Sequence, residues 1–180
     1  MMLKRSPGLD IGLVAIFSVL LFISSIFVAY TSGYGAIIYS IFLLIGALVI
    51  GRPFSATLIS TVAGLIHSFQ SHFFLLILGT FLIRGLVVDL IFIPTKAYER
   101  ARSENPGRSL MIISMISMTL SGLAAGAYHY FFLILFLKMS ANVSSFVAIT
   151  IFLTSIISNI IAPYIVVKYL LPRLRLYNWS

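Results

Sequence analysis

The sequence contains no cysteine and very little charge. Only 9% of its 180 residues are charged, and only four of them are acidic. The missing cysteine excludes disulfides, thiolate metal sites and cysteine nucleophiles. A soluble domain is about a quarter charged, whereas this chain is 61% hydrophobic with a mean hydropathy of +1.12. A protein of this size has too little interior to hide that much apolar surface from water. We therefore predict an all-α, polytopic membrane protein in contact with the lipid bilayer.

The sequence also lacks the short motifs of common catalytic sites. It contains no H-E-x-x-H, no G-x-S-x-G and no G-x-x-x-x-G-K-[ST]. It has no pair of closely spaced carboxylates and no aspartate-rich segment of the kind that phosphoryl-transferring membrane enzymes use. We expect neither an enzyme nor a cofactor, and we expect no ATP hydrolysis by the chain itself. An intramembrane enzyme is the least favoured function class.

Six apolar runs predict a bundle of six transmembrane helices in a single domain, residues 1–180. A bilayer crossing takes about 20 residues. The runs cover 11–30, 36–50, 53–69, 73–93, 109–137 and 143–171. The first run is longer than the core of a signal peptide, so we expect it to be retained. The second and third runs are short, and one broken or re-entrant element is an alternative to two spans.

The basic residues predict the orientation in the membrane. Cytoplasmic loops carry an excess of Lys and Arg. One side holds ten of the twelve basic residues, namely Lys4, Arg5, Arg52, Lys96, Arg100, Arg102, Arg108, Lys168, Arg173 and Arg175, and the other side holds Lys138. This bias places both termini and the loop from Thr95 to Arg108 in the cytoplasm. The net charge of +8 thus reflects membrane topology, and we expect no nucleic-acid partner.

Arg84 is the most informative polar residue, because it lies within the fourth apolar run. A charge near the centre of a bilayer is costly and needs a partner, a water-filled cavity or an anionic ligand. Asp89 follows five residues later, about 140° around a helix, where an ion pair is poor but within side-chain reach. Pairing with Asp89 and a functional role for Arg84 both stay open.

His129 is the second candidate, flanked by Tyr128 and Tyr130. Aromatic residues near a membrane interface commonly anchor a helix at the headgroup level. Alternatively, a tyrosine stacks on a flat ligand ring while the histidine hydrogen-bonds the edge of that ring. Consecutive helical residues point about 100° apart. We therefore expect His129 to face the binding site with one tyrosine at its margin.

Four further residues are candidates for the same site. His67 lies at the end of the third run, and Asn159, deep in the sixth, suits either helix packing or ligand contact. Tyr34 and Asn142 lie in loops on the same predicted side and would close over a ligand. The histidines lack the i, i+4 spacing of a helical ligand pair, so we expect no metal site.

Two stretches carry a family resemblance. Arg52-Pro53-Phe54-Ser55-Ala56-Thr57-Leu58 opens the third run, and Arg84-Gly85-Leu86-Val87-Val88-Asp89-Leu90-Ile91-Phe92 closes the fourth. Together they resemble the substrate-binding S components of energy-coupling-factor (ECF) transporters, in the branch for thiamin and its hydroxymethylpyrimidine precursor. Gly85 matches that branch, Asp89 stands at its glutamate, and Arg84 stands at its glutamine. A fixed cation at that position would repel a cationic thiazolium and favours an anionic or carbonyl-bearing ligand.

The resemblance covers the first four runs and implies a function. S components are small six-helix proteins that bind a vitamin near the outer face of the plasma membrane. They act with a transmembrane coupling subunit and cytoplasmic ATPase subunits. The resemblance also places docking on the coupling subunit near Gly12, Ala15 and Ser18 in the first run. The alternative is a non-transporting membrane scaffold or assembly subunit without a ligand.

Overall fold

The computed structural model describes residues 7–31, 35–103 and 107–178, and this part of the chain is helical without strands. The helices are α1 (Pro7–Tyr30), α2 (Ala36–Ile50), α3 (Ser55–Ser68), α4 (Phe74–Phe92), α5 (Ala97–Arg102), α6 (Gly107–Leu135) and α7 (Ala141–Ile165), followed by a π-helical turn (Val166–Leu170) and α8 (Leu171–Asn178). The predicted all-α class is confirmed.

Four helical segments in this part of the chain are long and apolar enough to cross a membrane. They are Gly8–Val28, Phe74–Phe92, Gly107–Leu135 and Ala141–Leu174. Helices α2 and α3 are apolar as well, but their 15 and 14 residues make them only about 20 Å long. Large apolar side chains are exposed along α1 and α7, among them Ile11, Phe27, Phe146 and Ile157. Such a continuous apolar exterior fits lipid rather than water, so the chain is a membrane protein.

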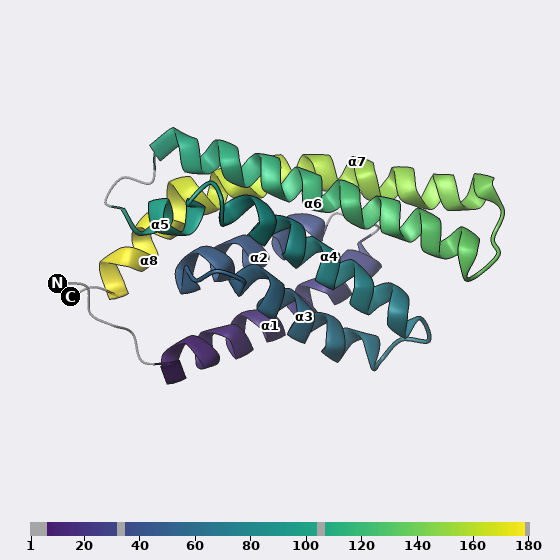
Figure 1. The fold of residues 1–180 in the computed structure, drawn as a ribbon, viewed down its shortest axis with the longest axis horizontal. Helices are drawn as coiled ribbons and strands as arrows, with labels where there is room; N and C mark the ends of the chain where they lie inside the picture. The colour runs from purple at the N-terminus through teal and green to yellow at the C-terminus, as the bar shows by residue number, and fades with distance from the viewer. Residues whose placement is uncertain (1–6, 32–34, 104–106, 179–180) are drawn as a thin grey trace.

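The long helices form one bundle (Figure 1). Helix α3 packs along α4, α6 packs along α7 and α4, and α1 packs on α2 and α3. Helix α2 also contacts α7, which places α2 inside the bundle. Its residues Leu43 and Leu44 are fully buried in a core shared with Ile59 of α3 and Val88 of α4.

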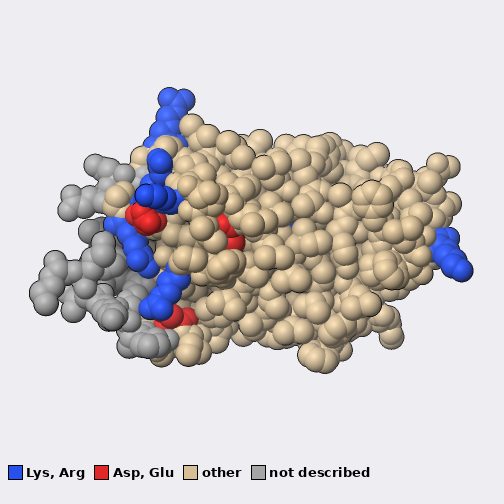
Figure 2. Space-filling model, viewed as in Figure 1, with Lys and Arg blue, Asp and Glu red and all other residues tan. Residues whose placement is uncertain are grey.

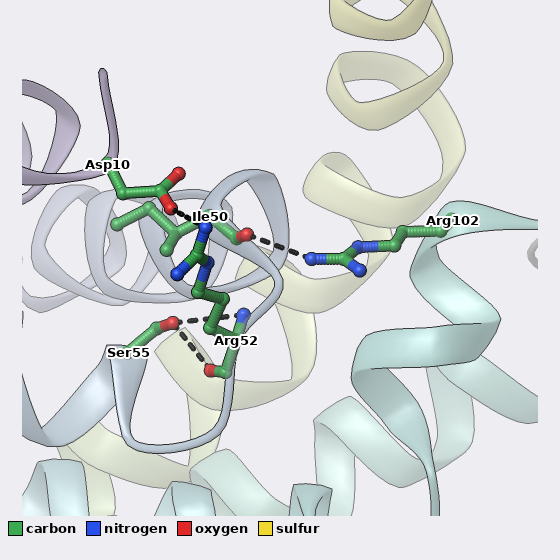
Figure 3. A network of polar contacts seen from close by, with 5 residues as sticks. All are labelled: Asp10, Ile50, Arg52, Ser55 and Arg102. Atoms are coloured by element: carbon green, nitrogen blue, oxygen red, sulfur yellow. Dashed lines mark hydrogen bonds and ion pairs between the residues drawn. The ribbon is translucent and has the colours of Figure 1, made fainter. Parts of the chain in front are cut away.

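The turn between α2 and α3 is held by polar contacts at one end of the bundle (Figure 3). Gly51 takes the left-handed conformation, with φ of 64°, and ends α2. The Arg102 guanidinium donates to the free carbonyl of Ile50 at 3.4 Å. Arg52 forms an ion pair with Asp10 of α1 at 2.5 Å. These contacts join the starts of α1 and α3, the end of α2 and the α5 segment.

The start of α3 and the segment before α6 differ from the sequence-based prediction in ways that matter for the fold. Helix α3 begins at Ser55 rather than at residue 53, because Phe54 has φ of 65°, outside the right-handed helical region. The segment predicted as a loop from Thr95 to Arg108 contains the short helix α5. This helix buries Ala97, Tyr98 and Ala101 against the bundle and leaves its charged residues exposed.

Basic side chains gather at one end of the bundle, as Figure 2 shows. That end holds α5, α8 and the start of α1 (Figure 1). The loop between α6 and α7, which contains Lys138, lies at the opposite end. The charge asymmetry that the sequence predicts is therefore present along the length of the bundle.

Candidate functional site

A cavity of about 240 Å³ lies inside the bundle, and α1, α2, α3, α4, α6 and α7 all contribute to its wall. Its wall combines apolar residues with several polar side chains: Ser25, Tyr39, His67, Thr80, Arg84, His129 and Ser155. A concave, mostly apolar pocket with a few convergent polar groups is the usual form of a small-molecule site.

The cavity lies in the half of the bundle away from the basic end. Its residues come late in α1, α3 and α6, and early in α2, α4 and α7. Because successive long helices run in opposite directions (Figure 1), these positions all fall in the same half. His67, near the end of α3, and Arg84, in the middle of α4, mark its extent along the bundle.

Arg84 is the only cation among the cavity residues that the structure describes. Its Nε and Nη2 are enclosed, and neither has a hydrogen-bond partner in the described part of the chain. The guanidinium carbon lies 4.5 Å from the centre of the Tyr39 ring, a cation–π contact. This contact stabilises the charge but supplies no hydrogen-bond acceptor to Nε or Nη2.

Asp89 forms hydrogen bonds with residues other than Arg84. Thr57 of α3 donates its backbone N–H and its hydroxyl to one carboxylate oxygen, at 2.7 and 2.6 Å. The Tyr98 hydroxyl donates to the other oxygen. Burial and the adjacent carboxylate raise the pKa of Tyr98, so its hydroxyl remains a donor at neutral pH. Asp89 thus caps α3, and the geometry disfavours the pairing with Arg84 that the sequence left open.

The two cavity histidines each form a hydrogen bond within the protein through the same ring nitrogen, Nδ1. His129 Nδ1 lies 3.0 Å from the Ala125 carbonyl, which can only accept, so Nδ1 carries the proton. His67 Nδ1 lies 2.8 Å from Ser25 Oγ. The Ser25 hydroxyl already donates to the Phe22 carbonyl at 2.6 Å, so its oxygen accepts from His67. A neutral imidazole with its proton on Nδ1 accepts through Nε2, and Nε2 of neither histidine has a hydrogen-bond partner among the described residues.

Asn159 lies outside the wall of the cavity. Its amide accepts from Ser40 of α2 at 2.9 Å and donates to the Met118 carbonyl of α6 at 2.7 Å. The residue is fully buried. It therefore joins three helices, which is the packing role of the two that the sequence left open.

The flanking tyrosines of His129 point elsewhere. The Tyr128 hydroxyl donates to the Leu75 carbonyl at 2.8 Å, and Tyr130 stacks edge-on against Phe131. Neither belongs to the described wall of the cavity, and the exposed Asn142 does not belong to it either. Tyr34 lies outside the described residues.

The three residues predicted for docking do not share one face of α1. Gly12 and Ala15 are exposed, whereas Ser18 is buried and donates to the Ile59 carbonyl at 3.1 Å. Steps of three residues rotate by 300° each, so Ser18 falls about 120° away from Gly12. The exposed pair alone remains available to a partner.

Sequence reasoning missed Tyr39, Thr80, Ser25 and Ser155 as cavity residues. The signal for Tyr39 was the buried cation itself, since Arg84 needs an aromatic or acidic neighbour and the spans contain almost no acid. Hydroxyl residues give no such signal, because they commonly bond to their own helix. Thr80, for example, donates to the Leu76 carbonyl at 2.6 Å.

Within the described part of the chain, no group of three acidic or histidine side chains is arranged to hold a metal ion. Comparison with protein-family models, with curated proteins and with solved structures finds no match to this chain.

Proposed function

We propose that the chain is the membrane-embedded substrate-capture subunit of an ECF-type importer for a small vitamin or vitamin precursor. In this proposal six helices span the plasma membrane, both termini are cytoplasmic, and the cavity is reached from the outside. The observation that carries the proposal is the cavity around Arg84, whose guanidinium Nε and Nη2 have no hydrogen-bond partner among the described residues.

The energetics of the cavity favour a ligand. Buried charges in membrane helices are costly and mark functional sites unless they are paired. The inner wall also exposes unused acceptors on His67 and His129. A purely structural bundle gains by filling such a space with apolar side chains. Dense packing around Arg84 and His129 would support the scaffold alternative. Both residues instead line a cavity, which favours ligand binding.

The absence of nucleotide motifs in the sequence requires separate subunits to drive uptake. A transmembrane coupling subunit and cytoplasmic ATPases would supply that work. The exposed apolar face of α1, with Gly12 and Ala15 in it, is one surface on which a coupling helix can approach closely, because small residues permit close helix contact.

A ligand screen on the purified chain in detergent tests the proposal. A molecule that binds only the folded state raises its melting temperature, by an amount that grows with concentration above Kd. We expect at least one vitamin or vitamin precursor to do so, and we expect the isolated chain to hydrolyse no ATP. His129→Ala should weaken binding by about 1–2 kcal/mol. His72→Ala, in the exposed turn before α4, is the matched control and should leave affinity unchanged.

Two results would count against the proposal. If no metabolite in a broad panel stabilises the folded chain, the cavity is not a capture site. If liposomes containing this chain alone accumulate substrate against its gradient, the predicted dependence on partner subunits is wrong.

A further inference from the structure

We infer that the ligand is a small aromatic acid that carries one carboxylate and at least one N–H or O–H donor, and that cationic thiamin is not the substrate. This inference rests on the proposed function and narrows its substrate class. It combines three features of the cavity: its charge, its unused acceptors and its size.

The charge argument starts from the four acidic residues of the chain, Asp10, Asp89, Glu99 and Glu104. Asp10 pairs with Arg52 and Asp89 bonds to Thr57 and Tyr98, while Glu99 is exposed on α5. Glu104 lies outside the described residues, in the segment between α5 and α6. No described wall residue is acidic. The Arg84 charge therefore lacks an acidic counterpart within the described wall, and a carboxylate accepts a guanidinium fork better than a neutral group does.

The acceptor argument comes from the histidines. Each histidine donates its Nδ1–H to a protein oxygen: His129 to the Ala125 carbonyl and His67 to the Ser25 hydroxyl. Each then offers only the Nε2 lone pair. A ligand that fits both histidines must donate, so an amino or hydroxyl substituent suits them better than a bare ring edge.

The size argument limits the ligand to one ring. The cavity holds about 240 Å³, below the roughly 300–1,000 Å³ of sites for drug-sized molecules. Phe81, Ile77 and Ile151 supply apolar wall, which suits the faces of an aromatic ring. Tyr39 is less available for stacking, because Arg84 covers one side of its ring and Phe81 meets it edge-on at 5.5 Å.

Matched acids and amides test the inference on the unaltered protein. The probes are 4-aminobenzoate, 4-aminobenzamide and benzoate, together with thiamin and its neutral hydroxymethylpyrimidine precursor. Binding is measured by calorimetry on the full chain in detergent, in one low-salt buffer for every probe so that competing anions are kept low and equal. We expect 4-aminobenzoate to bind roughly 10- to 100-fold more tightly than its amide, the range for one charged hydrogen-bonded contact. Benzoate, which lacks the donor, should bind about 2- to 10-fold less tightly than 4-aminobenzoate.

A variant pair assigns the preference to Arg84. Arg84→Gln should abolish the preference for the acid over the amide. Arg173→Gln, which removes the same charge from an exposed position in α8, should retain it. If Arg84→Gln does not fold, the comparison of acid with amide on the unaltered chain decides alone.

The outcomes separate this inference from the proposed function. If the amide binds as tightly as the acid, or if thiamin or the pyrimidine binds and the acids do not, the inference is overturned while a capture role survives. If no probe and no metabolite of the wider panel binds the folded chain, the proposed function fails and the inference fails with it.

Discussion

Asp89 of α4 joins three helices, α3, α4 and α5, through a single carboxylate. Thr57 occupies the first turn of α3, where backbone N–H groups lack partners within the helix. Asp89 reaches across from α4 and accepts from that N–H and from the Thr57 hydroxyl, while Tyr98 satisfies its second oxygen. A buried carboxylate with donors on both oxygens is the arrangement in which such a group stabilises a fold.

The first prediction concerns this contact. Asp89→Ala leaves the Thr57 N–H and the Tyr98 hydroxyl buried without an acceptor, so we expect the free energy of unfolding to fall by about 3 kcal/mol. Tyr98→Phe removes only one donor and should cost about 2 kcal/mol. Unfolding by a denaturing detergent measures both changes. Glu99→Ala, one residue after Tyr98 but exposed, is the control and should change stability by less than about 0.5 kcal/mol. Equal stability of Asp89→Ala and Glu99→Ala would contradict the capping role.

At the residue scale, charge is what sequence reasoning detects. Arg84 and His129 were predicted to face a site, and both line the cavity. Asn159 is equally conspicuous in an apolar run, yet its side-chain amide forms hydrogen bonds with Ser40 and with the Met118 carbonyl. Whether a buried polar group faces a cavity or a neighbouring helix depends on helix rotation and on distant partners. A single sequence specifies neither the rotation of the helix nor the distant partners of a residue such as Asn159.

Helix packing in the bundle depends on a few glycines. A Cβ on Gly122 of α6 would lie 2.7 Å from the Ser155 Cβ and 2.8 Å from the Asn159 Nδ2, closer than side-chain atoms pack. Four residues later, a Cβ on Gly126 would lie 3.6 Å from the Ala148 carbonyl oxygen, an ordinary contact. The G-x-x-x-G spacing therefore contains one glycine that the α6–α7 contact requires and one that it does not.

The second prediction uses this contrast. Gly122→Ala forces α6 and α7 apart at Ser155 and disturbs the amide of Asn159, so it should lower the free energy of unfolding by about 1–3 kcal/mol. Gly126→Ala has room for its methyl group and gains helix propensity, so it should leave stability unchanged or raise it by up to about 1 kcal/mol. Detergent unfolding of the two variants side by side measures the difference. Equal losses would show that the close approach is not at Gly122.

At the element scale, long apolar runs predict helices well and their ends less well. The six predicted runs correspond to α1, α2, α3, α4, α6 and the continuous segment from α7 into α8, because the length of an apolar stretch can be read directly from the sequence. The start of α3 differs because Phe54 takes a left-handed conformation that propensity does not predict. Helix α5 was missed because six residues give no period, and its burial depends on Tyr98 reaching Asp89 of α4.

The whole molecule is polarised along its length. Lys and Arg gather at the end with α5 and α8 (Figure 2), and the cavity lies in the other half. Cytoplasmic loops carry an excess of Lys and Arg, so we expect the cavity to face the outside. In that orientation the α2–α3 turn, with its Asp10–Arg52 ion pair, would lie on the cytoplasmic side.

The last prediction tests that orientation by cysteine labelling, which is clean here because the chain has no native cysteine. Ser103 follows α5 at the basic end, and Ser140 precedes α7 at the opposite end; both are exposed. An impermeant thiol reagent added to intact cells should label Ser140→Cys and leave Ser103→Cys unlabelled until the cells are opened. The two positions lie beyond opposite ends of α6. This helix has 29 residues and is about 43 Å long, which exceeds the roughly 30 Å hydrocarbon core of a bilayer. Labelling of Ser103→Cys but not Ser140→Cys in intact cells would invert the topology and turn the cavity toward the cytoplasm. Labelling of both from outside would mean that α6 does not cross the membrane.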